Sequence, residues 1–308
     1  MIVRWSLGEL PELLGELGIE RPFLVASPRW DTPVDAVGRW SEIPSHRADV
    51  EGSPDGILAI GGGSAIDTAK GLSAATELPL VSVPTTYSGA EWTTFFGVRD
   101  SDRRMRGGGA GAHPAGIVYD VSLTMDLPHE VTGGTALNAL AHCCEALYVR
   151  DRDPAADPVA LEGADLISRA LPRVLEDGGD VEARTELLQG AAHGGEALGR
   201  SGLALGHAMA QAIGGAYGLP HGALNAICLP PALRFNADFV PSALLEGRAA
   251  ERAEQLAHLS GFTTLGALGV PKADLPRLAD AIAQRPGAKA NPREATPTEV
   301  EALLCSVF

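Results

Sequence analysis

The sequence predicts a parallel α/β domain followed by an all-helical domain. Before Leu127-Pro128, short apolar runs alternate with helical patterns, which is the order of elements in a parallel sheet with crossover helices. After this point, apolar residues recur at helical spacing and no clear strand pattern follows. The 308 residues are enough for two domains. We therefore expect domains at residues 1–127 and 128–308.

The elements of the first domain follow from local patterns. Residues 7–18 place leucines at helical spacing and predict a helix, and a second helix is expected over 64–76. The charged and then glycine-rich residues 99–111 predict a hairpin or loop, whereas residues 31–53 show little periodicity. Apolar runs predict strands at 21–26, 56–60, 78–83, 95–98 and 117–119.

A glycine-rich turn, Gly61-Gly62-Gly63, joins the strand at 56–60 to the helix that follows. Glycines let the backbone approach a ligand closely, and the first N–H groups of a helix favour an anion. Ser64 is expected to cap this helix, with Asp67 three residues later as in a capping box. The turn therefore predicts a phosphate site, although a tight turn without a ligand has the same sequence pattern.

The second domain is predicted from helical periodicity and its interruptions. Proline and glycine separate the segments, for example at Asp153-Pro154 and Gly218-Leu-Pro220. Ligand sites favour the cleft between two such domains, at the carboxyl ends of parallel strands. The expected helices span 130–149, 157–175, 181–200, 202–217, 221–236, 245–259, 274–284 and 297–307.

Charge and cysteine content limit the classes of function. A net charge of −15 argues against nucleic acid or an anionic membrane surface as a partner, but it permits a small anionic substrate. The four cysteines form no CxxC pair, a pattern typical of a reduced compartment. The sequence shows neither a signal-peptide pattern nor an apolar run of membrane-spanning length. We expect a cytoplasmic protein that binds a small molecule.

Three histidines of the helical half are candidate functional residues. Asn138 and His142 share a helix face at i, i+4, His207 follows a glycine, and His221 begins a helix after Gly-Leu-Pro. Histidines on neighbouring helices can build a metal or substrate site. Each one can equally be a buried, hydrogen-bonded side chain without a ligand. The other five histidines, including His193 and His258, are interpreted as structural.

Five motifs in order resemble the iron-containing alcohol dehydrogenase superfamily, and within it the maleylacetate reductases. The resemblance covers most of residues 56–236 and implies a dehydroquinate synthase-like fold with a Rossmann-like N-terminal domain. It also implies a homodimer. The motifs are Gly61-Gly-Gly-Ser-Ala-Ile-Asp-Thr-Ala-Lys70, Pro84-Thr-Thr-Tyr-Ser-Gly89, Asn138-Ala-Leu-Ala-His-Cys-Cys-Glu-Ala146, Gly206-His207 and Gly218-Leu-Pro-His221.

The resemblance implies NADH or NADPH as cofactor. The residues that would bind its pyrophosphate are those of the glycine turn and the start of the helix. The loop after the next strand would meet its phosphate, ribose or nicotinamide, and Asp67 stands at the family's carboxylate position near the nicotinamide. The implied cofactor residues are Gly61, Gly62, Gly63, Ser64, Asp67, Thr85, Thr86 and Ser88.

Metal-dependent members of the superfamily bind Fe²⁺ or Zn²⁺ with one aspartate and three histidines. The matching positions here are Asn138, His142, His207 and His221, so an amide replaces the carboxylate. A neutral amide is a poor ligand, and the site loses its negative charge. We therefore expect no metal; if iron or zinc does bind, these four residues are its ligands.

The expected activity is NAD(P)H-dependent reduction of a keto acid such as maleylacetate to 3-oxoadipate. Hydride would pass to a ketone carbon while His207 or His142 supplies a proton, and His221 would hold a substrate carboxylate or share the catalytic role. Three departures leave alternatives open: a short segment at 28–55, and Asn225 and Pro231 at positions where maleylacetate reductases commonly have histidine. These are a metal-dependent alcohol or aldehyde dehydrogenase, a diverged biosynthetic reductase, and a non-catalytic cofactor-binding homologue.

Overall fold

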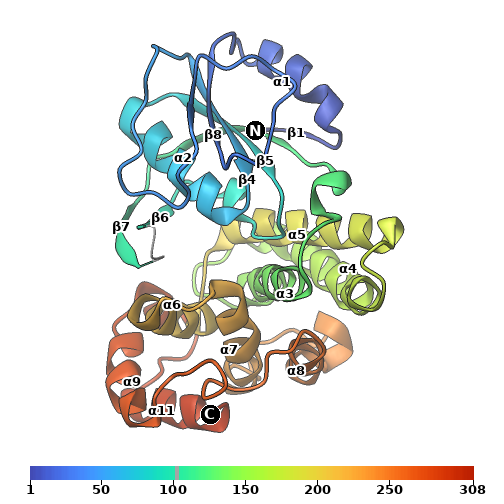
Figure 1. Cartoon of the computed structure of the whole chain (residues 1–308). Coiled ribbons are helices and arrows are strands. Elements are labelled where there is room, and N and C mark those ends of the chain that lie inside the picture. The colour runs from blue at the N-terminus through green and yellow to red at the C-terminus, as the bar shows by residue number, and fades with distance from the viewer. Residues whose placement is uncertain (101–103) are drawn as a thin grey trace. The chain divides into compact units, whose positions relative to one another are not determined.

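The computed structural model describes residues 1–100 and 104–308, which divide into two compact units, Met1–Met125 and Asp126–Phe308. Figure 1 shows the helices and strands of each unit, coloured by residue number. The domain boundary at residue 127 stays a prediction.

A parallel sheet forms the first unit, as the sequence predicted. Among the described residues, six strands pair in the order β1-β8-β5-β4-β2-β3, and every pairing is parallel. The prediction of a Rossmann-like parallel α/β fold is confirmed. The strands are β1 (Ile2–Arg4), β2 (Pro22–Ala26), β3 (Gly38–Trp40), β4 (Gly56–Gly61), β5 (Pro79–Pro84) and β8 (His113–Val118).

Two helices cover opposite faces of this sheet. The buried leucines of α1 (Leu10–Glu16) pack against one set of alternate strand residues, which includes Leu58 and Val81. The apolar side of α2 (Gly63–Thr76) packs against the other set, which includes Ile57 and Leu80. Because β4 is buried on both faces, its sequence reads as a continuous apolar run rather than an alternating one.

Two short strands of the structure were not predicted from the sequence. Strand β1 has only three half-buried residues, and β3 lies in the segment whose periodicity is weak. Both are edge strands of the sheet, held by pairing on one side, so their own sequences carry little signal. The expected hairpin forms from β6 (Phe96–Arg99) and β7 (Met105–Gly109), and residues 101–103 of that prediction lie outside the described residues.

The second unit is helical throughout, and the predicted fold class is confirmed. In residues 126–308, all of them described, no strand occurs, and α3 packs against α4, α5, α7 and α8 (Figure 1). No described helix is long and apolar enough to cross a membrane. The helices are α3 (His129–Ala146), α4 (Asp157–Glu176), α5 (Val181–Ser201), α6 (Leu205–Tyr217), α7 (His221–Phe235), α8 (Ala249–Leu259), α9 (Leu275–Ala283), α10 (Pro286–Lys289) and α11 (Pro297–Ser306). Short 3-10 turns occupy Leu7–Glu9, Ala90–Trp92, Val121–Thr124, Pro154–Ala156, Leu244–Gly247 and Lys272–Asp274.

Candidate active site

The glycine turn between β4 and α2 leaves no room for side chains at two positions. A Cβ at Gly61 would lie 2.7 Å from the Cβ of Ala65, and Gly61 has a φ of +154°. A Cβ at Gly62 would lie 2.8 Å from Cγ2 of Thr86. Helix α2 begins at Gly63, so its first backbone N–H groups follow directly on this bare turn. Such a start suits an anion.

The predicted cap of α2 is wrong. Gly62 is the N-cap residue and makes no side-chain cap, so Ser64 lies inside the helix rather than before it. Asp67 does not reach back to the helix start. Its Oδ2 instead accepts the Gly97 backbone N–H at 3.2 Å, and its Oδ1 lies 3.5 Å from Nζ of Lys70. Asp67 therefore ties α2 to the β6–β7 hairpin, because the N-cap is Gly62, two residues before the expected Ser64.

The loop after β5 places hydroxyl groups beside the turn. The Thr85 backbone N–H donates to the Gly61 carbonyl at 3.0 Å. The buried Oγ1 atoms of Thr85 and Thr86 have no hydrogen-bond partner within residues 1–100 and 104–308. Ser88 Oγ accepts the Ala90 backbone N–H at 3.5 Å, and a Cβ at Gly63 would lie 3.2 Å from that oxygen. Unpartnered buried hydroxyls cost free energy, and phosphate or ribose oxygens would satisfy them.

Lys70 and Glu91 anchor the same region and were not predicted as functional. Lys70 is buried and its Nζ donates to Thr93 Oγ1 at 2.6 Å and to the Phe95 carbonyl at 3.0 Å. Burial lowers its pKa, although Asp67 and Glu91 oppose that shift. Glu91 accepts the Tyr119 hydroxyl at 2.7 Å, and burial raises its pKa. Lys70 could be identified from its place in the glycine-turn motif, whereas no sequence pattern points to Glu91.

The structure brings three predicted histidines together in the second unit. His142 comes from α3, His207 from α6 and His221 from the first position of α7. The rings of His142 and His207 stack with centroids 4.8 Å apart, and His207 and His221 lie 5.7 Å apart. His142 and His207 are almost fully buried. Burial, reinforced by the two neighbouring imidazoles, places the pKa of His142 well below its ordinary value.

A buried carboxylate, Glu145, orients His207. Glu145 is fully buried and lies one turn after His142 on α3. Its Oε2 lies 2.8 Å from His207 Nδ1 and accepts the Ala204 backbone N–H at 2.7 Å, while Oε1 accepts the His207 N–H at 3.2 Å. Nε2 of His207 is buried and has no hydrogen-bond partner in the described part of the chain. Glu145 lies in the Asn138–Ala146 motif, but the sequence pattern alone indicates no role for it.

Two asparagines connect the other two histidines. Nδ2 of Asn225, on α7, donates to Asn138 Oδ1 at 2.6 Å and lies 3.0 Å from His221 Nε2. Nδ2 of Asn138 lies 3.4 Å from His142 Nε2. All four polar groups therefore belong to one chain of contacts, in which Asn138, His142 and Asn225 are buried and His221 is half-buried. The sequence placed Asn138 at a ligand position, whereas Asn225 appeared only as a departure from relatives.

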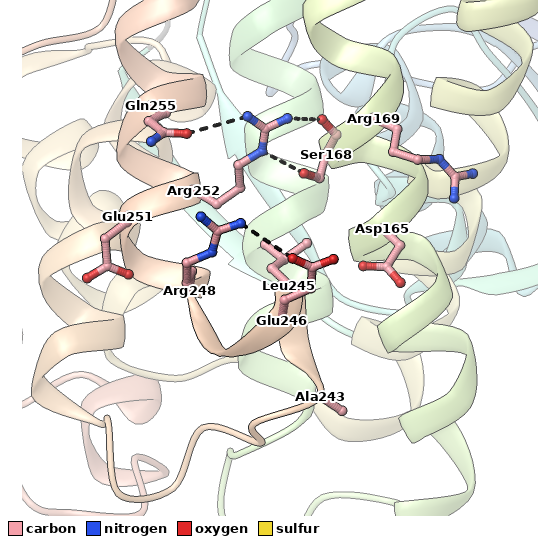
Figure 2. Close-up of a pocket in the computed structure, with 10 residues that line it drawn as sticks. All are labelled: Asp165, Ser168, Arg169, Ala243, Leu245, Glu246, Arg248, Glu251, Arg252 and Gln255. Atoms are coloured by element: carbon pink, nitrogen blue, oxygen red, sulfur yellow. Dashed lines mark hydrogen bonds and ion pairs between the residues drawn. The ribbon is translucent and has the colours of Figure 1, made fainter.

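A separate hollow of about 360 Å³ lies between α4 and the start of α8 (Figure 2). Arg252 fills one wall, where its guanidinium donates to Ser168 Oγ at 2.8 Å and to the Ser168 carbonyl at 2.6 Å. Arg248 and Glu246 pair at 3.4 Å and are exposed. Two of the arginines that line this polar hollow, Arg248 and Arg252, are therefore held by neighbouring protein groups.

Comparison with known proteins identifies the family. The model for the C-terminal part of the Fe-containing alcohol dehydrogenase family matches residues 132–308, and the iron-containing alcohol dehydrogenase model matches residues 45–120. The chain belongs to the iron-containing alcohol dehydrogenase family. It is therefore an NAD(P)-dependent oxidoreductase.

The similar proteins include several maleylacetate reductases. Maleylacetate reductase 1 of Rhodococcus opacus is 34% identical over 97% of this chain and 84% of its own length. Maleylacetate reductase 1 of Cupriavidus pinatubonensis is 33% identical over 97% of this chain and 92% of its own. The crystal structure of maleylacetate reductase from Agrobacterium tumefaciens has a TM-score of 0.88 and 29% identity, and covers 100% of this chain and 95% of that one.

The first unit fits the cofactor of this family. The bare glycine turn gives a pyrophosphate close access to backbone N–H groups, which a Cβ at Gly61 or Gly62 would obstruct. The unpartnered hydroxyls of Thr85 and Thr86 add hydrogen-bonding groups beside it.

The second unit fits the family's metal poorly. The candidate ligands are Asn138, His142, His207 and His221, and the amide oxygen of Asn138 already accepts a hydrogen bond from Asn225. No cluster of three or more histidine, cysteine, aspartate or glutamate side chains in residues 1–100 and 104–308 is arranged to hold a metal ion. An amide supplies no negative charge to offset the cost of moving a divalent cation out of water.

Proposed function

We propose that this chain reduces maleylacetate to 3-oxoadipate with NADH or NADPH and without a metal ion. The relatives that are 32–35% identical and carry the name maleylacetate reductase support the substrate. The observation that carries the mechanism is the buried Nε2 of His207, which has no hydrogen-bond partner among the described residues and belongs to a ring that Glu145 orients.

The balance of atoms defines what the site must do. Maleylacetate carries a carbon–carbon double bond between a carboxylate and a ketone, and 3-oxoadipate keeps the ketone but not the double bond. The hydride therefore adds to the alkene carbon beside the carboxylate, and the electron pair moves to the ketone oxygen as an enolate. A proton then returns to the other alkene carbon. The expectation that hydride passes to the ketone carbon therefore does not hold for this substrate, and the histidines would contact an enolate rather than an alkoxide.

Bound NAD(P)H supplies the hydride. We assign its pyrophosphate to the backbone of Gly61, Gly62 and Gly63 and to Ser64 at the start of α2. The hydroxyls of the loop after β5 would hold ribose or phosphate oxygens, and Asp67 keeps its proposed place on the nicotinamide side. The loop residues in this assignment are Thr85, Thr86 and Ser88.

His207 is the proposed group that stabilises the enolate and moves the proton. Its Nδ1 faces the Glu145 carboxylate, which stabilises the positive charge of an imidazolium, and its Nε2 remains for the substrate oxygen. His142 suits this role less well, because its lowered pKa keeps the ring neutral. His221 lies at the N-terminus of α7, where backbone N–H groups favour a substrate carboxylate.

The test is NADH and NADPH oxidation by the purified protein with maleylacetate, before and after chelator treatment, with elemental analysis of bound metal. The proposal expects turnover that survives chelation and metal far below one equivalent. Loss of turnover on chelation, restored by iron or zinc, would point to a metal-dependent alcohol dehydrogenase. Cofactor binding without turnover on any carbonyl or enone substrate would point to a non-catalytic homologue.

We also propose that the protein is a cytoplasmic homodimer that does not bind nucleic acid or membrane. The acidic net charge supports the absence of binding to nucleic acid and membrane. The four free cysteines support a reduced, cytoplasmic location. Two-fold dimers are the commonest soluble assemblies. Sedimentation analysis measures the mass in solution, and a monomer of 31.9 kDa would contradict the dimer.

A further inference from the structure

The side chain of Asn225 lies between Asn138 and His221, at two positions where metal-dependent members of this family carry metal ligands. It stands on α7 one turn after His221 and is almost fully buried. One amide nitrogen contacts both the carbonyl oxygen of Asn138 and the Nε2 of His221, at 2.6 Å and 3.0 Å. An amide NH₂ carries two hydrogens, so these two contacts use its full donor capacity.

The hydrogen bonds occupy the atoms that a cation would need. A metal-bound histidine gives its ring lone pair to the metal, and a donor amide facing the same nitrogen competes for that lone pair. Asn225 faces Nε2 of His221, and the Asn138 amide nitrogen faces Nε2 of His142 at 3.4 Å. The Asn138 oxygen already uses one of its two lone pairs to accept the Asn225 N–H. Of the four candidate ligand atoms, only Nε2 of His207 has no hydrogen-bond partner among the described residues.

We propose that Asn225 acts as an amide lock that closes the histidine cluster to divalent cations. This inference rests on the metal-free reduction proposed above, and it assigns that property to a second residue besides Asn138. Two uncharged side chains then take the place of an ion. Asn225 bridges His221 and Asn138, and Asn138 in turn contacts His142. His142 and His221 are then held without a positive charge between them, while Glu145 holds His207.

The proposed role of Asn225 predicts a result that the lack of a carboxylate at position 138 does not predict by itself. If the amide at position 138 were the only obstacle, Asn138→Asp would restore a metal site in one step. With Asn225 in place, its NH₂ still donates to His221, so a metal ion must break that hydrogen bond, and it must also share the new carboxylate with the same amide. Each bond is worth roughly a few-fold to tenfold in an equilibrium constant. Full affinity therefore needs both changes.

The experiment measures Zn²⁺ binding by calorimetry on the purified full chain, in wild type, N225A, N138D and the N138D/N225A double variant. We expect no saturable binding to the cluster in wild type, weak binding in N138D, and binding about tenfold or more tighter in the double variant. Co²⁺ serves as a second probe, because its visible spectrum reports a site with nitrogen and oxygen ligands. N138D/N225L removes the same hydrogen bonds while filling most of the volume, so it tests the lock if the alanine variant fails to fold.

Addition of H207A to the double variant is the control for binding elsewhere, and it should abolish the Co²⁺ spectrum. Equal Zn²⁺ affinity of N138D and the double variant would overturn the lock. Stoichiometric Zn²⁺ in wild type that depends on His207 would overturn it too. The proposed function is tested separately by turnover of maleylacetate in wild type, so the lock can stand if that substrate fails, and the substrate can stand if the lock fails.

Discussion

The glycine turn of the first unit and the histidine cluster of the second are built in opposite ways. The turn is made of backbone and small side chains that lie between Gly61 and Ser88 in the sequence. The cluster depends on side chains far apart in sequence: Asn225 bonds Asn138 across 87 residues, and His207 contacts Glu145 across 62. The first is a local device, and the second exists only after the helices have packed.

This difference predicts two kinds of failure. A substitution in the turn acts by steric exclusion, so it should weaken cofactor binding more than the chemical step. A substitution in the cluster removes a group with a chemical role or leaves a buried partner unsatisfied, so it should reduce kcat.

The largest effect is expected for His207→Ala. Loss of the group that moves a proton should lower kcat for maleylacetate by about 10²–10⁴-fold, with KM for NAD(P)H little changed. Steady-state kinetics measures both constants, and H258A, at the exposed end of α8, is the matched control. A variant within a few-fold of wild type would remove His207 from the mechanism.

Glu145→Gln should have the next largest effect. The amide removes the charge beside His207 Nδ1, and its NH₂ group cannot accept the backbone N–H groups that the carboxylate binds. We expect kcat to fall by about 10–100-fold, the range seen when partners of ligand histidines are removed. Imidazole ¹⁵N NMR should show a changed protonation pattern for His207. An unchanged spectrum and unchanged kcat would make Glu145 a purely structural residue.

The same division explains what the sequence could predict. The parallel sheet, the helical second unit and the glycine turn follow from patterns within short windows, and these predictions agree with the structure. Glu145 and Asn225 show their roles only through partners on other helices, and no local pattern distinguishes them from other buried polar residues. The edge strands β1 and β3 were missed because pairing, not their own sequence, holds them.

Gly62→Ala tests the local device. The added Cβ would lie 2.8 Å from Thr86, and relief of such overpacking costs about 1–3 kcal/mol. If the turn opens to accommodate it, KM for NAD(P)H should rise by about tenfold or more, with a smaller change in kcat. Gly107→Ala is the matched control, because a Cβ there meets nothing within 4 Å. Equal KM values for the two variants would show that the turn does not contribute to cofactor binding.

The smallest effect is expected at the capping box of α11, where the local sequence pattern does form the cap. At α2 the Ser64-x-x-Asp67 pattern forms no cap, whereas at α11 Thr296 and Glu299 cap each other reciprocally. The difference lies in what precedes the pattern: a glycine turn starts α2 early, while Pro297 follows Thr296 directly and fixes the first turn of α11.

The Thr296 backbone N–H, the Arg293 guanidinium and the Thr296 hydroxyl lower the pKa of Glu299 from 4.5 to about 2. A carboxylate with a lowered pKa in the folded state stabilises the fold above its unfolded pKa, and that contribution disappears as the pH falls from about 4.5 toward 2. Glu299→Gln should therefore be less stable than wild type at neutral pH and should lose less stability over that acidic interval. Thermal unfolding followed against pH measures this, with Glu301→Gln on the same helix as the charge-matched control. Parallel pH profiles for wild type and E299Q would mean that the cap does not hold in solution, and that even this local pattern needs its tertiary context.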